Sequence, residues 1–137
     1  MTLKSHSLKT VLVVDDEPTI RMMLYRLLTG DGYHCLEAAD GIAALEIIGG
    51  AHHVDLLITD VAMPRLGGCE LLIAARKILP ALPVIVMSGA VDLRSPSFQR
   101  LSECFDVRDA IQKPFDPVVV LARVRQAIGH ATNTIEL

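Results

Sequence analysis

Polar groups that could do chemistry follow four short apolar segments of this 137-residue chain. The acidic run Asp15-Asp16-Glu17 follows the first segment, and Asp60, Ser88 and Lys113 each follow or end a later one. Clustered carboxylates repel one another and need a cation, and oxygen ligands without His or Cys favour Mg²⁺ or Mn²⁺. A carboxylate beside such a cation can attack phosphorus and form an acyl phosphate, while a lysine and a hydroxyl bind the phosphate oxygens. These residue types therefore predict phosphoryl-transfer chemistry.

The four groups meet only if the apolar segments are neighbouring strands of one sheet. Their β-branched residues stand back to back, which is typical of parallel strands buried on both faces. We expect strands at 11–14, 54–59 and 83–87, with weaker candidates at 33–36 and 107–112. Apolar residues at helical spacing predict helices over 18–28, 40–48, 68–79 and 117–128, with Asp40 as an N-cap.

The alternation of strands and helices predicts an α/β fold, a doubly wound five-stranded parallel sheet with helices on both faces. In such a sheet ligands bind at the carboxyl ends of the strands, near the point where the strand order reverses. The four polar groups all follow strands, so they are expected to share that edge.

Length and composition narrow the function further. The chain fits one domain, and its net charge of −3 without a basic tract argues against binding to nucleic acid or to an anionic membrane. We expect a frayed N-terminus over 1–9, a domain over 10–129 and a short tail over 130–137. No apolar run is long enough to span a membrane, and no signal peptide is evident, so a cytoplasmic location is expected.

The cysteines and histidines point to no further chemistry. Cys35, Cys69 and Cys104 are too widely spaced for a metal or redox pair, and each is expected to be a small apolar residue. The five histidines show no ligand spacing near the acids and are expected on the surface or near a terminus. They are His6, His34, His52, His53 and His130.

Four motifs in order resemble the response-regulator receiver domain of two-component signalling. They are VLVVDDEP, LLITDVAMPRLGG, PVIVMSGA and QKPF, and the resemblance covers roughly residues 10–129. It implies a flavodoxin-like sheet of order 2-1-3-4-5. It also implies a single-domain, chemotaxis-regulator-like protein that receives a phosphoryl group and signals by protein–protein contact.

The resemblance assigns a role to each matching position. Asp60 matches the phosphoryl acceptor, Ser88 the switch hydroxyl and Lys113 the phosphate-binding lysine. Asp15, Asp16, Asp60 and the backbone carbonyl of Ala62 match the Mg²⁺ ligands. Pro114 matches a residue that follows a cis peptide bond. The implied donor is a sensor histidine kinase or a histidine phosphotransfer protein. The chain would catalyse only its own phosphorylation and dephosphorylation. A monomer is expected, with a dimer as the alternative.

Three features of the sequence depart from the family. Ala110 stands where the family has the aromatic residue of its conformational switch. Between Ser88 and Lys113 the chain is unusually long, and Ser95 and Pro96 predict an altered fourth helix that runs to Cys104. Ala62 and Ala90 stand at two positions that influence how water reaches the acyl phosphate. Alanine cannot orient water, so we expect no side-chain acceleration of dephosphorylation.

Three other classes fit less well. A phosphatase of the haloacid dehalogenase type needs an acid two residues beyond its nucleophile, where Asp60 is followed by Ala62. A flavin-binding electron carrier would bring its phosphate against Asp15-Asp16-Glu17 and be repelled. A pseudo-receiver, which binds proteins without phosphorylation, remains as the alternative, although neither the acids nor Lys113 are lost.

Overall fold

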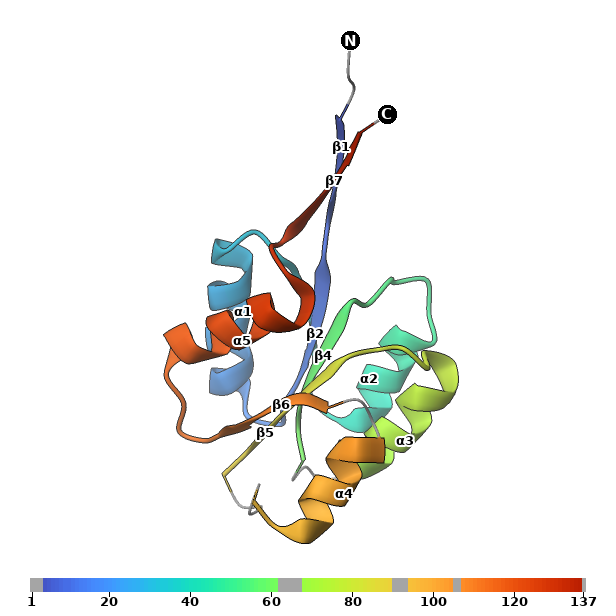
Figure 1. Cartoon of the computed structure of the whole chain (residues 1–137), viewed down its shortest axis with the longest axis vertical. Coiled ribbons are helices and arrows are strands. Elements are labelled where there is room, and N and C mark those ends of the chain that lie inside the picture. Colours follow the sequence, from blue (N-terminus) through green and yellow to red (C-terminus); the bar gives the residue numbers. More distant parts are fainter. Residues whose placement is uncertain (1–3, 62–67, 90–93, 105–106, 137) are drawn as a thin grey trace.

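Five parallel strands form the central sheet in the order β3-β2-β4-β5-β6 (Figure 1). Their bounds are His34–Ala38 for β3, Thr10–Val14 for β2, Leu56–Asp60 for β4, Val84–Ser88 for β5 and Val107–Gln112 for β6. Counted within this sheet alone, the order is 2-1-3-4-5, which confirms the predicted fold. This computed structural model describes residues 4–61, 68–89, 94–104 and 107–136.

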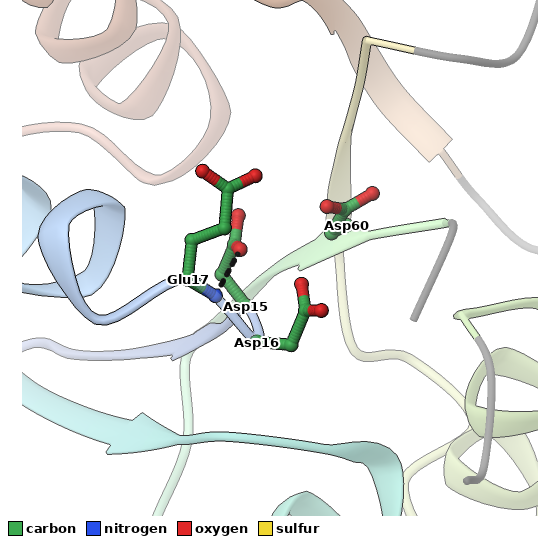
Figure 2. Close-up of side chains that lie close together, drawn as sticks. All are labelled: Asp15, Asp16, Glu17 and Asp60. Carbon is green, nitrogen blue, oxygen red and sulfur yellow. Dashed lines mark hydrogen bonds between the residues drawn. The ribbon is translucent and has the colours of Figure 1, made fainter. Parts of the chain in front are cut away.

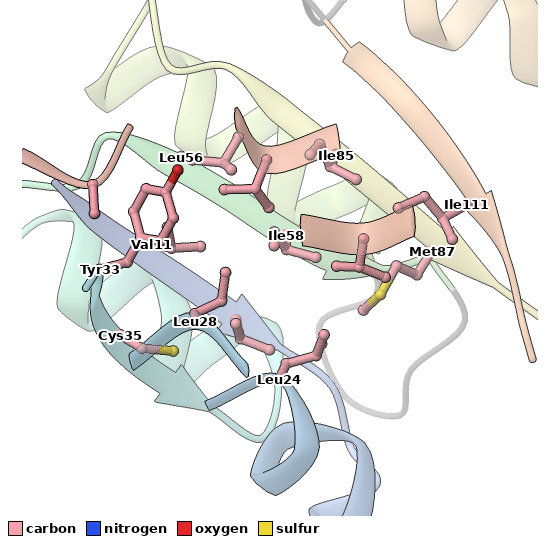
Figure 3. Packing of buried hydrophobic residues seen from close by; sticks show 14 residues of the cluster. Val11, Leu24, Leu28, Tyr33, Cys35, Leu56, Ile58, Ile85, Met87 and Ile111 are labelled. Atoms are coloured by element: carbon pink, nitrogen blue, oxygen red, sulfur yellow. The ribbon is translucent and has the colours of Figure 1, made fainter. Parts of the chain in front are cut away.

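The central strands are buried on both faces. All five residues of β2, β4 and β5 are buried. Along β2, Val11 and Val13 join one apolar cluster, while Leu12 and Val14 join the other. Successive side chains of a strand point to opposite faces, so a continuous apolar run can fill two cores. Figure 3 shows the first cluster, to which Val11, Leu24 and Leu28 belong.

Five helices cover the two faces. They are α1 (Pro18–Gly30), α2 (Gly41–Ile48), α3 (Gly68–Ile78), α4 (Pro96–Cys104) and α5 (Pro117–Ile128). Helices α1 and α5 lie side by side on one face, and α2 and α3 lie on the other (Figure 1). The predicted cap is confirmed, because the Asp40 side chain accepts a hydrogen bond from the Ala43 N–H at the start of α2. Asp116 caps α5 in the same way through the N–H of Val118, which the sequence analysis did not identify.

Helix α4 has the bounds that the sequence predicted. The Ser95 hydroxyl accepts a hydrogen bond from the N–H of Phe98 at 3.2 Å, and Pro96 opens the helix. Phe98 is 6% exposed and joins the apolar cluster on the α2 and α3 face. The aromatic ring of one residue thus attaches this short helix to the sheet.

A second, two-stranded sheet lies outside the central one. β1 (Lys4–Leu8) and β7 (Thr132–Glu136) pair antiparallel and project together from the domain (Figure 1). The sequence analysis predicted no strand in either segment, because neither carries an alternating or continuous apolar pattern. Next to the pair, the N–H of Lys9 donates a hydrogen bond to the carbonyl of Ala131 at 2.7 Å, so the two ends of the chain lie together.

Candidate functional site

The carboxyl ends of four neighbouring strands converge at one edge of the sheet. The turn after β2 carries Asp15, Asp16 and Glu17, and Asp60 is the last residue of β4. Carboxylate oxygens of these four residues all lie within 4.8 Å of one another. Figure 2 shows the three acids of the turn facing Asp60. The structure thus brings together the acids that the sequence singled out.

Lys113, which follows β6, is bound to this acid cluster. Its Nζ atom donates hydrogen bonds to Asp15 Oδ2 at 2.7 Å and to Asp60 Oδ2 at 2.8 Å. The same ammonium lies 3.6 Å from Glu17 Oε1. Asp15 is fully buried and Asp60 is 5% exposed, so these contacts form largely out of water. The ammonium group of Lys113 therefore links a carboxylate that follows β2 to one at the end of β4.

Burial and charge act in opposite directions on these groups. Burial raises the pKa of the Asp15 carboxyl, although the hydrogen bonds from Lys113 and from the Glu17 N–H partly offset it. Burial alone would lower the pKa of the Lys113 ammonium, but the hydrogen bonds to Asp15 and Asp60 outweigh it, so the pKa lies above its usual value. Lys113 is consequently charged at neutral pH.

Ser88 lies at the matching end of β5 and is fully buried. Its carbonyl accepts a hydrogen bond from the Lys113 N–H at 2.8 Å. The Lys113-Pro114 peptide bond is cis, as the resemblance implied. Backbone contacts between β5 and the end of β6 therefore position the hydroxyl and the lysine at the same edge.

The donor set fits a hard divalent cation. All groups of the cluster are carboxylates, and Mg²⁺ and Mn²⁺ prefer such oxygen ligands. Asp16 is exposed, while Asp15 and Asp60 gather around the positive charge of Lys113. The predicted ligand Ala62 lies outside the described residues, as does Ala90.

One acid of the cluster was not assigned a role in the site. Glu17 was named only as part of the acidic run, yet its carboxylate lies within the cluster, and its side chain makes no cap hydrogen bond at the start of α1. Its N–H donates to Asp15 Oδ1 at 2.9 Å, the contact drawn as a dashed line in Figure 2. The position of Glu17 directly after Asp16 is the sequence feature from which its place in the site could have been predicted.

Ala110 lies on β6 and is partly buried against the cluster that contains Phe98. A small residue stands here, as the sequence showed, and the aromatic side chain of that cluster comes from α4. Helix α4 contacts β6 directly. Two of the features in which the sequence departs from the family, Ala110 and helix α4, therefore lie next to each other in the structure.

The chain belongs to the response regulator receiver domain family, whose family model matches residues 11–125. Among curated proteins, it is 36% identical over 120 residues to the DNA-binding transcriptional regulator NtrC of Escherichia coli strain K12. It is 39% identical over 127 residues to the transcriptional regulatory protein KdpE of Mycobacterium tuberculosis strain H37Rv. These matches cover 88% and 93% of this chain but 25% and 54% of the relatives, so the chain spans about half their length or less.

Solved structures share the fold. A CheY-like receiver domain protein from Methanospirillum hungatei JF-1 superposes with a TM-score of 0.81 at 28% identity, covering 89% of this chain and 94% of its own. The receiver domain of the hybrid histidine kinase CckA is 37% identical with a TM-score of 0.71, covering 87% and 98%. Within the part of the chain that the structure describes, no helix is both long and apolar enough to cross a membrane.

Proposed function

We propose that Asp60 accepts a phosphoryl group from the phosphohistidine of a sensor kinase or of a phosphotransfer protein. The observation that carries the proposal is the ammonium of Lys113, bound to Asp60 at 2.8 Å and to Asp15 at 2.7 Å. Asp60 thus lies beside a fixed positive charge within the acid cluster. Membership of the receiver family supports the same assignment.

The transfer is a displacement at phosphorus. A carboxylate oxygen of Asp60 forms the new O–P bond, while the P–N bond of the donor breaks and its electron pair stays on the imidazole nitrogen. Lys113 is already within hydrogen-bond distance of Asp60, so it can follow the added negative charge with little movement. Ser88, the last residue of the next strand, would bind a phosphoryl oxygen through its hydroxyl.

The acid cluster implies a divalent cation, Mg²⁺ or Mn²⁺. Asp15, Asp16 and Asp60 would hold it together with the backbone carbonyl of Ala62. When bound, the cation offsets the negative charge that gathers on the phosphoryl oxygens. The protein's part is to keep these carboxylates together despite their repulsion, and the ammonium of Lys113 offsets the repulsion between two of them, Asp15 and Asp60.

The output is proposed to be contact with another protein, which the added phosphoryl charge would alter. The relatives named above include a DNA-binding regulator, and each is longer than this chain. The proposal does not extend their activities to this chain. The donor is proposed to meet the chain in the cytoplasm. No substrate other than the donor's phosphoryl group is required.

Intact-mass spectrometry after incubation with acetyl phosphate tests this function. We expect one added phosphoryl group that requires both Mg²⁺ and Asp60, and none on the Asp60→Asn variant. Asp55→Asn is a matched control, because Asp55 precedes β4 at the opposite end of the strand. A folded wild-type chain that takes no phosphoryl group under any donor would favour the pseudo-receiver reading.

A further inference from the structure

Arg21 of α1 contacts the backbone of the acid cluster, and the proposed chemistry gives this residue no role. Its Nη1 atom donates a hydrogen bond to the backbone carbonyl of Asp15 at 2.6 Å. The side chain is 19% exposed, so this charge-assisted bond is mostly shielded from water. The contact reaches back across the turn that carries Asp15, Asp16 and Glu17.

This bond completes the fixation of Asp15. Its N–H donates to the carbonyl of Ala38 at 3.2 Å, which ties the turn to β3. The Glu17 N–H donates to Oδ1 and the Lys113 ammonium to Oδ2. Arg21 binds the remaining polar atom, the carbonyl oxygen. Every polar atom of Asp15 thus has a partner, and only the carbonyl is held by a side chain of α1.

The carbonyl of Asp15 also controls its neighbour. It belongs to the planar peptide unit that links Asp15 to Asp16, so fixing this oxygen fixes the orientation of that plane. The position of the Asp16 Cα atom, from which its side chain extends, follows from that plane. Asp16 itself is exposed.

The ion pair of Arg21 does not explain its position equally well. Its Nε atom lies 3.8 Å from Glu37 Oε1, and the Glu37 side chain is 38% exposed. Such a loose, wet pair contributes little. It does offset the charge of the guanidinium, so Arg21 repels a cation at the acid cluster less than an unpaired arginine would.

We propose that Arg21 is a positioning residue, which holds the Asp15-Asp16 peptide in the orientation that a divalent cation requires. The inference rests on the proposed function, since it concerns the same acid cluster. It makes a prediction of definite sign. Loss of a nearby positive charge should strengthen cation binding, whereas loss of positioning should weaken it, so the two roles give opposite results.

Calorimetric titration with Mg²⁺ alone, without a phosphoryl donor, measures this sign. Arg21→Met keeps the length and apolar stem of the side chain, and we expect it to weaken Mg²⁺ binding about tenfold, as loss of an outer partner of a metal ligand does. Arg21→Lys keeps the charge but not the planar fork, and we expect partial rescue. Arg26→Met removes the same charge from an exposed position of α1 and should leave the affinity unchanged.

Amide hydrogen exchange in metal-free protein gives a second readout. We expect Arg21→Met to speed exchange at Glu17, whose N–H is bound to Asp15, but not at Val13 in the sheet. Equal or tighter Mg²⁺ binding by Arg21→Met, or unchanged exchange at Glu17, would overturn the inference. Failure of the wild type to bind Mg²⁺ would instead overturn the proposed cation chemistry, while the exchange measurement would still decide the role of Arg21. If Arg21→Met does not fold, Arg21→Lys carries both measurements.

Discussion

At the scale of single residues, the acid cluster depends on one ammonium group. Asp15 is fully buried, and its Oδ2 accepts a hydrogen bond from Lys113. Removing one partner of such a pair leaves a buried carboxylate without its counter-charge, which costs more than the pair contributes. Lys113 is therefore expected to affect both the stability of the fold and the chemistry of the site.

The variant Lys113→Met should lower the free energy of unfolding by about 1–3 kcal/mol without Mg²⁺, because the buried carboxylates lose their cation. Added Mg²⁺ should recover part of the loss, since a divalent cation can take over the neutralisation. Urea denaturation with and without Mg²⁺ measures both effects. Lys77→Met, at an exposed position of α3, is the control. A Lys113→Met protein as stable as the wild type in the absence of Mg²⁺ would contradict this account.

Cys35 gives a prediction about pH. Burial raises the pKa of its thiol to about 12. An unfolded thiol ionises near pH 8.5, so the unfolded chain loses its proton first and stability falls as pH rises from about 8.5 to 12. The difference in melting temperature between the wild type and Cys35→Ala should therefore shrink with rising pH. Melting curves at several alkaline pH values test this, and a constant difference would refute it.

At the scale of elements, the strands were predictable because burial on both faces requires continuous apolar runs. The polar residues that follow or end these strands could then be named as candidates for one shared site from the sequence alone. They are Asp15, Asp60, Ser88 and Lys113. The predicted strand over 54–59 begins later, at Leu56, because the Asp55 side chain accepts a hydrogen bond from the N–H of Thr10 instead. Long-range contacts of this kind leave no periodic signal in a sequence.

Helix α4 packs on the domain through the buried side chain of Phe98, so this residue should contribute to the stability of the fold. Phe98 is its buried aromatic residue, and Phe-to-Ala changes in a core cost about 3–5 kcal/mol. We expect Phe98→Ala to lower the free energy of unfolding by about 3 kcal/mol, at the low end because the helix is short. Gln99→Ala, at an exposed neighbouring position, should have little effect. Chemical denaturation distinguishes the two, and a Phe98→Ala loss no greater than that of Gln99→Ala would show that the ring does not anchor α4.

At the scale of the whole molecule, the terminal sheet lies outside the receiver fold. The family model ends before β7, and β1 and β7 pair with each other rather than with the central sheet. This terminal sheet could not be predicted, because its pairing joins residues from opposite ends of the chain. Isolated two-stranded sheets are marginally stable, so it should contribute little to the domain.

A shortened chain of residues 9–131 tests that separation. It keeps the Lys9 to Ala131 hydrogen bond and the Tyr33 hydroxyl bond to the Gly129 carbonyl, both of which fasten the end of α5. We expect the same circular dichroism spectrum and a melting temperature within a few degrees of the full chain. Loss of cooperative unfolding would show that the terminal sheet belongs to the domain.

The account as a whole depends on which carboxylate receives the phosphoryl group. Borohydride reduces an aspartyl phosphate to homoserine, so peptide mass spectrometry after phosphorylation and reduction locates the acceptor. Asp15, Asp16 and Asp60 compete within one cluster, which makes this measurement decisive. We predict homoserine at position 60 alone, formed only when Mg²⁺ is present. Homoserine at position 15 or 16 would contradict the assignment of Asp60 as the phosphoryl acceptor.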